Sequence, residues 1–109
     1  MAKLEHTFQG DFDETLYRLH NGILNGSMSA SYEDEAEWSS GGVRCAVRVY
    51  ERYSYMGGNR VSLSLTLLDD GSGKLHLIAI TSGGSQAVFW KVNTFGEEAF
   101  LDKLRELLP

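Results

Sequence analysis

The sequence predicts a single α+β domain over residues 1–109, in which a curved antiparallel sheet carries two helices on one face. Three observations predict it: an amphipathic helical stretch near the N-terminus, a long succession of segments that alternate with period two, and a second helical stripe at the C-terminus. Short turns join the strand-like segments, and connections of hairpin length make neighbouring strands antiparallel. The expected order is strand, helix, four or five strands, helix, written β-α-β4(5)-α.

The N-terminal elements are a strand and a capped helix. Residues 3–9 alternate apolar and polar side chains and stop at Gly10. Asp11 stands three residues before Glu14, which is the spacing of a capping box, so a helix begins there. Its apolar side chains recur at helical intervals and form one stripe: Phe12, Leu16, Leu19 and Ile23. Gly26 suits the left-handed residue that closes such a helix.

Two strands are expected next, over residues 27–38 and 43–55, with a turn at 39–42. One face of the first strand carries Met28, Ala30, Tyr32, Asp34, Ala36 and Trp38. One face of the second carries Val43, Cys45, Val47, Val49, Tyr53 and Tyr55, and the opposite face carries Arg44, Arg48 and Arg52. We expect the faces that bear tyrosine and valine to point toward the core. Pairing across the turn then sets glutamates opposite arginines and fixes the register: Trp38 with Val43, Glu37 with Arg44, and Glu33 with Arg48.

The rest of the chain adds further strands and a final helix. Residues 61–67 alternate leucine or valine with serine or threonine, as in a half-buried strand, and residues 75–80 are apolar on both faces. Residues 81–85 are expected to be irregular, and residues 87–92 to form one more short strand. The last helix begins at Thr94 or Gly96 and buries a stripe of five side chains: Phe100, Leu101, Leu104, Leu107 and Leu108.

Two resemblances accompany this order of elements. The succession resembles the helix-grip architecture shared by TATA-box-binding-protein-like and Bet v 1-like domains, in which a curved sheet wraps a C-terminal helix. The segment Ile80-Thr81-Ser82-Gly83-Gly84-Ser85-Gln86, followed by Asn93-Thr94-Phe95-Gly96-Glu97-Glu98, looks like small bacterial families known only as domains of unknown function. Neither resemblance carries a functional motif, so they imply a fold and no activity.

Composition excludes several classes of function. The chain has 10 Lys and Arg against 15 Asp and Glu, a formal charge of −5. Nucleic acids and anionic membranes both select a positive surplus, so we expect neither as a partner. The N-terminus has no apolar targeting segment, and no run of residues is long enough to span a membrane, so a soluble, cytoplasmic domain is expected.

The residues that most often carry chemistry are not grouped along the chain. His6, His20 and His76 are scattered without metal-ligand spacing, and Cys45 is the single cysteine, so we expect no metal site, no cofactor and no disulfide. Cys45 falls on an apolar strand face, where a thiol is most often a small hydrophobe. The turn at residues 83–85 lacks the lysine and the helix of a phosphate-binding loop.

One polar and aromatic cluster can be built on the face expected to point inward. It joins Asp34 to three tyrosines and is the candidate ligand-binding site: Tyr32, Asp34, Tyr53 and Tyr55. A buried carboxylate is costly unless it is paired, so Asp34 lies either at the rim of the sheet or in a polar pocket. In the second case Asp34 and the tyrosines would form an enzyme-like acid–base pocket, which is the alternative functional hypothesis.

The favoured hypothesis is a non-enzymatic domain, homodimeric, that binds a partner protein or a small apolar ligand. Strand 75–80 bears Ile78 and Ile80 on the side away from the helices, and Trp90 lies in the next strand. Monomers rarely expose such a patch, and a twofold copy is the simplest cover. The alternative is that the last loop of the same chain folds over this face. The expected dimer interface is therefore Ile78, Ile80 and Trp90.

Overall fold

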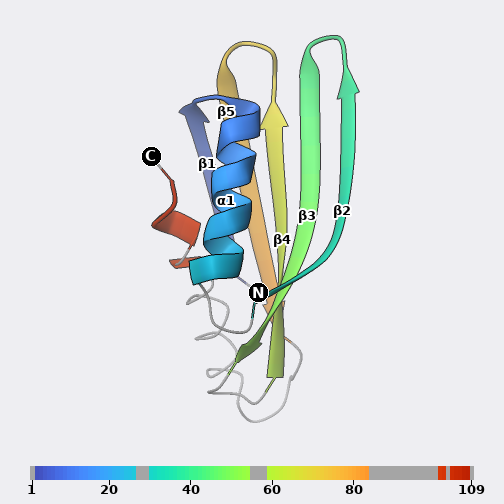
Figure 1. Ribbon diagram of the computed structural model, residues 1–109. Helices are drawn as coiled ribbons and strands as arrows, with labels where there is room; N and C mark the ends of the chain where they lie inside the picture. Colours follow the sequence, from blue (N-terminus) through green and yellow to red (C-terminus); the bar gives the residue numbers. More distant parts are fainter. Residues whose placement is uncertain (1, 27–29, 55–58, 84–100, 103, 109) are drawn as a thin grey trace.

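The computed structural model is an α+β domain built on a five-stranded antiparallel sheet (Figure 1). It describes residues 2–26, 30–54, 59–83, 101–102 and 104–108. The elements in chain order are β1 (Ala2–Gln9), α1 (Phe12–Gly26), β2 (Ser31–Ser40), β3 (Val43–Ser54), β4 (Asn59–Asp69) and β5 (Lys74–Gly83). The strands lie in the order β1-β5-β4-β3-β2, so the sheet is open and β1 and β2 are its edges. The predicted α+β class and the antiparallel sheet are confirmed.

Helix α1 begins where the sequence predicts, and its apolar stripe forms the core against the sheet. The Asp11 carboxylate accepts a hydrogen bond of 2.8 Å from the backbone N–H of Glu14, which satisfies a donor of the first turn. All four side chains of the predicted stripe are buried: Phe12, Leu16, Leu19 and Ile23. They pack against the inner faces of β4 and β5, which contribute Val61, Leu63, Leu65, Leu67, Leu75, Leu77 and Ala79.

The described part of the C-terminal segment packs into the same core. Residues 101–102 and 104–105 are helical, and Leu101 and Leu104 have no exposed surface. The Leu107 side chain packs directly against Gly22 of α1, so a larger residue at position 22 would require Leu107 to shift. The predicted strand over residues 87–92 and the start of the predicted last helix lie outside the described residues.

The prediction of which face of β3 is inward was wrong. Among the β3 side chains that the structure describes, the buried ones are Ala46 and Tyr50, which belong to the arginine face. Cross-strand partners share a face, and these two pair with Leu67 and Leu63 of β4, whose leucines face α1. Arg44 is accommodated on this side because its guanidinium lies over the ring of Phe12, 4.2 Å from the ring centroid. It also makes two hydrogen bonds of 2.9 Å to the Asp13 carboxylate.

The predicted pairing of β2 with β3 was also wrong, because the turn is tighter than expected. Ser40 pairs with Val43, and Trp38 therefore pairs with Cys45 rather than with Val43. The turn consists of Gly41 and Gly42, both with positive φ (56° and 86°), as a two-residue hairpin turn requires. In this register Arg48 lies opposite Glu35, and the side chains form an ion pair with Nε and Oε1 3.4 Å apart.

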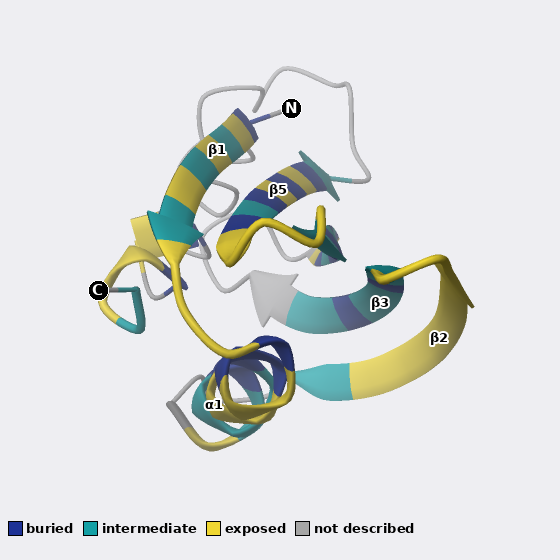
Figure 2. Cartoon of the chain, turned by 90° about the horizontal axis from the view of Figure 1, so that it is seen from above, coloured by how far each residue is buried: buried dark blue, intermediate teal, exposed yellow. Residues whose placement is uncertain are grey.

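A bulge in β2 separates two residues that the sequence placed together. Tyr32 pairs with Tyr50, but Asp34 pairs with Val49, so Glu33 is an extra residue on this strand. Side chains before and after a bulge fall on opposite faces. Tyr32 therefore shares the helix side with Tyr50, whereas Asp34 lies on the other side. Figure 2 shows how the sheet curves, so that the start of β2 comes close to α1.

Strand β5 is longer than predicted, because residues expected to be irregular still pair. Thr81 is fully buried and pairs with both Ala2 of β1 and Leu63 of β4. Its hydroxyl donates a hydrogen bond of 3.3 Å to the carbonyl of Ala2. Threonine suits this buried strand position because it is β-branched and its hydroxyl has a hydrogen-bond partner on the neighbouring strand.

Candidate functional site

The inner side of the sheet carries one polar and aromatic group, at the seam between α1 and the β2–β3 hairpin. The Nδ1 atom of His20 on α1 is hydrogen-bonded to the hydroxyl of Tyr50, at 2.7 Å. The ring of Tyr32 meets the His20 ring edge to face, with centroids 4.9 Å apart, and lies 5.7 Å from the Tyr50 ring. The Tyr32 hydroxyl donates to Glu35, which also pairs with Arg48. We call these five residues the His20 cluster.

The electrostatics of the His20 cluster keep its three rings uncharged near neutral pH. Burial, with a further contribution from the Arg48 charge, lowers the pKa of His20 below its ordinary 6.5. Burial also raises the pKa of Tyr50, and burial together with the hydrogen bond to Glu35 raises the pKa of Tyr32 to about 12. A neutral imidazole whose Nδ1 is already engaged by a tyrosine is a packing and hydrogen-bonding group. The cluster therefore fastens α1 to the β2–β3 hairpin.

Acidification is expected to destabilise the fold through His20. Its pKa is lower in the folded chain than in the unfolded one, so its contribution is fully present above pH 6.5 and is lost as the pH falls through the folded value. The midpoint of thermal unfolding should fall between about pH 7 and about pH 5.5, and His20→Gln should flatten that dependence. His6→Gln on β1 is the matched control and should leave the slope unchanged. An equal slope in the His20→Gln variant would contradict the assignment.

The structure divides the four residues of the predicted ligand-binding site. Tyr32 belongs to the His20 cluster, while Asp34 lies beyond the bulge, where its carboxylate accepts a hydrogen bond of 2.8 Å from the backbone N–H of Glu35. The backbone of Tyr53 pairs with Arg60, but its side chain is outside the described part, as is the whole of Tyr55. Tyr32 and Asp34 do not converge on one pocket.

The side of the sheet away from α1 is apolar over much of its area, and we call it the outer face. Cross-strand pairing places eight apolar side chains on it: Ala36, Trp38, Cys45, Val47, Val49, Leu68, Ile78 and Ile80. Trp38 is 62% exposed, and Ile78 and Ile80 are 39% and 40% exposed. Trp38, Val47 and Val49 were expected inside. A shallow hollow of about 140 Å³ lies between β2 and β3, lined by Asp34, Glu35, Ala36, Val47 and Val49. No described element covers the outer face (Figures 1 and 2).

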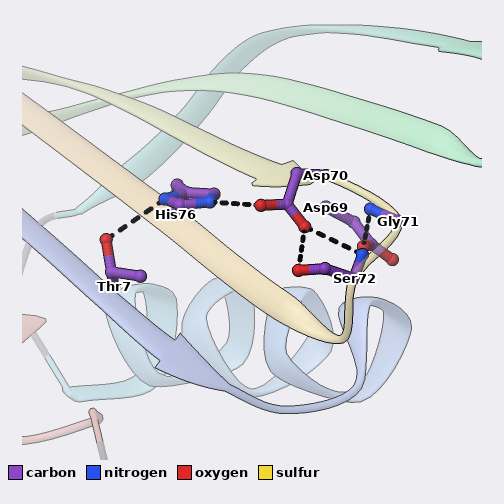
Figure 3. Close-up of polar contacts among 6 residues, drawn as sticks. All are labelled: Thr7, Asp69, Asp70, Gly71, Ser72 and His76. Atoms are coloured by element: carbon purple, nitrogen blue, oxygen red, sulfur yellow. Dashed lines mark hydrogen bonds and ion pairs between the residues drawn. The ribbon is translucent and has the colours of Figure 1, made fainter.

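One hydrogen-bonded group of polar side chains, Thr7, His76 and Asp70, was not predicted from the sequence. His76 of β5 lies between Thr7 of β1 and Asp70, which follows β4, and hydrogen bonds join both to its ring (Figure 3). Thr7 and His76 are 69 residues apart in the chain, so no local spacing reveals them. The signal that could have found them is the pairing of the first strand with strand 75–80, which sets Thr7 directly opposite His76.

The described residues contain neither a group of metal ligands nor a helix that could cross a membrane. Within the ranges given above, no three His, Cys, Asp or Glu side chains are grouped closely enough to hold a metal ion. None of the helices described there has the length and apolarity that crossing a bilayer requires.

Comparison with solved structures gives the fold and not the activity. PA94 from Pseudomonas aeruginosa, a protein of unknown function described as a candidate regulator, is 10% identical, with a TM-score of 0.55 over 100% of this chain and 85% of its own. The hypothetical protein jhp0584 from Helicobacter pylori is 9% identical, with a TM-score of 0.46 over 94% of this chain and 83% of its own. A variant of protein Mog1 is 12% identical, with a TM-score of 0.49 over 96% of this chain and 61% of its own.

Sequence comparison identifies the family. No curated protein matches the sequence. A family model does match over residues 1–109, the whole chain, and its description is a family of unknown function. The predicted resemblance to a family without a known activity is thus confirmed: this chain belongs to the family of unknown function DUF6054.

Proposed function

We propose that this chain is a small binding domain that associates with a second copy of itself through the outer face. The observation that carries the proposal is the exposure of Ile78 and Ile80 on the same face as Trp38 and the valines of the β2–β3 hairpin, from which only the small side chains of β4 separate them. Exposed apolar side chains in one continuous area mark interaction surfaces, whereas single ones are ordinary. The predicted interface residues Ile78 and Ile80 lie within this area, and Trp90 lies outside the described residues.

The charges on the outer face favour an identical partner. Lys3 pairs with Glu5, with Nζ and Oε2 3.6 Å apart, and Arg60 pairs with Glu51, with Nη1 and Oε1 2.7 Å apart. Each of these pairs is neutral as a whole, and Asp34 adds a single negative charge beside Val49, so the face offers no cluster of like charge that would select a partner of opposite charge. An apolar face without such a cluster can meet its own copy across a twofold axis.

The central strand of the outer face also suits packing of one sheet on another. β4 contributes Ser64 and Thr66 there, between the valines of β3 and the isoleucines of β5. Small side chains on the middle strand let a second sheet approach to the usual separation of about 10 Å. The apolar side chains on either side can then interdigitate.

The test is the oligomeric state of matched variants, measured by size-exclusion chromatography with light scattering at high micromolar concentration. The wild type is expected to be a dimer and Ile80→Glu a monomer, because a carboxylate in the interface would have to lose its water even with Lys3 opposite it. Tyr17→Glu is the control, since Tyr17 is 71% exposed on α1 and the same substitution there should leave the dimer intact. Circular dichroism of both variants checks the fold.

Two results would overturn the proposal. One is a wild type that stays monomeric at every concentration. The outer face would then be exposed to solvent or covered by another segment of the same chain. The other is a dimer that Ile80→Glu leaves unchanged. A copurified small apolar molecule found by native mass spectrometry, or a different protein bound to a monomer, would replace the second copy as the occupant.

The proposal keeps two finer expectations about architecture and location. Burial of Leu101 and Leu104 with the stripe of α1 supports a second helix on the same side of the sheet, as in the helix-grip arrangement. A cytoplasmic location stays a prediction from the sequence. An acid–base pocket built on Asp34 has no such support, because the bulge separates Asp34 from Tyr32.

A further inference from the structure

Three side chains at one end of the outer face form a continuous hydroxyl–imidazole–carboxylate relay (Figure 3). The Thr7 hydroxyl oxygen lies 3.1 Å from Nδ1 of His76. On the other side of the ring, Nε2 lies 2.8 Å from Oδ2 of Asp70. The His76 and Asp70 side chains are 36% and 38% exposed, and Thr7 is exposed, so a small molecule can reach them.

The carboxylate determines which ring nitrogen carries the proton. An ionised carboxylate only accepts hydrogen bonds, so Nε2 of a neutral His76 must be the protonated nitrogen that donates to Asp70. Nδ1 then has its lone pair free and can only accept. The Thr7 hydroxyl must therefore donate its proton toward Nδ1, which is the arrangement in which an imidazole acts as a general base on a hydroxyl.

Asp70 is held in place and ionised by its own loop. Its Oδ1 accepts two hydrogen bonds from Ser72, one of 2.9 Å from the backbone N–H and one of 2.6 Å from the hydroxyl. These hydrogen bonds, together with the one to His76, lower the pKa of Asp70. The other carboxylate oxygen, Oδ2, holds the ring of His76 in place. The group then has the three parts of a catalytic triad: a nucleophile, a base and a carboxylate that orients the base.

We propose that Thr7 is an acyl-accepting nucleophile, with His76 as its general base and Asp70 as the residue that positions His76. The substrate class is a small activated ester with a short acyl group. Thr7 Oγ1 bonds to the ester carbonyl carbon while its proton passes to Nδ1 of His76. The carbon–oxygen bond to the leaving alcohol then breaks, and His76 returns that proton to it. Water hydrolyses the acyl-threonine by the same route.

The neighbours of the relay are compatible with this substrate class. Leu68 pairs with His76 across the sheet, so an acyl group would find apolar surface beside the ring. Gln9 and Lys74 are the next pair on that face toward the turn. They bear an amide and an amine two residues along the same face from Thr7 and His76, and such groups can stabilise the negative charge that develops on a carbonyl oxygen.

The experiment is reaction of the full chain with p-nitrophenyl acetate, followed by mass mapping of the acetylated residue. We expect an acetyl group on Thr7, and release of p-nitrophenol that falls by about tenfold or more in Thr7→Val and in His76→Gln. Thr7→Ser should keep the acetyl group at position 7, which separates loss of the nucleophile from misfolding. His6→Gln is the matched histidine control and should react as the wild type does.

Asp70 requires a readout that a merely structural role would not change. Asp70→Asn should shift the pH profile of acetylation, because an amide no longer fixes the tautomer of His76. Acetylation confined to lysines, or release of p-nitrophenol that Thr7→Val leaves unchanged, would overturn the proposal. It goes beyond self-association, and the Ile80→Glu monomer should still be acetylated at Thr7, so the two proposals can fail separately.

Discussion

Replacing Tyr50 by alanine is expected to cost about 3–5 kcal/mol of folding free energy, the range for removing a large aromatic side chain from a core. Tyr50 has no exposed surface, lies against the leucines of β4 and is hydrogen-bonded to His20. Urea unfolding followed by circular dichroism measures the change. Many small domains are stable by only about 5–15 kcal/mol, so this one substitution could leave the chain partly unfolded.

The neighbouring residue on the opposite face provides the control. Val49→Ala should cost less than about 1 kcal/mol, because Val49 lies on the outer face and is only partly buried. Tyr50→Phe should fall between the two, because it keeps the ring and removes only the hydrogen bond. A larger loss from Val49→Ala than from Tyr50→Ala would mean that β3 faces the core with its valines and that the described register is wrong.

Leu104→Ala is expected to destabilise the chain by about 2–5 kcal/mol, although it lies only a few residues from the C-terminus. Leu104 has no exposed surface and belongs to the same core cluster as the stripe of α1. Chain ends usually tolerate substitution unless they are docked, so a cost of this size shows that the terminal segment completes the core.

The same urea titration measures this effect. Glu106→Ala, at an exposed position of the same segment, should be close to neutral. If Leu104→Ala were as mild as Glu106→Ala, the C-terminal segment would contribute nothing to the core, and the second helix of the proposed architecture would be refuted.

The spacing of apolar side chains predicted the buried face correctly in those elements where only one face is apolar. The stripe of α1 and the leucine face of β4 each bury one set of side chains and expose the other, so both were predicted correctly. Strand β3 is different, because either of its faces can be covered. Valine lies on one face, and Ala46 and Tyr50 lie on the other among arginines whose long apolar stems can pack against a helix.

The candidate sites depend on contacts that alternation along a strand does not contain. A one-residue bulge at Glu33 moves Asp34 to the outer face, and nothing in the alternation around it indicates an extra residue. The relay of Thr7, His76 and Asp70 depends on the pairing of the first strand with the last described one. The apolar outer side of β5 could be predicted because Ile78 and Ile80 break the alternation.

The position of β2 at the sheet margin has a consequence for how copies of this chain can meet. From Ser31 to Ser40 it carries four carboxylates and no cation, and nearly all of it is exposed. An exposed edge strand can pair with strands of further chains and so form fibres. Repulsion between two acidic β2 strands opposes that pairing. In the proposed dimer, the acidic β2 edge of each copy would therefore repel further chains, while the outer faces would pack against each other.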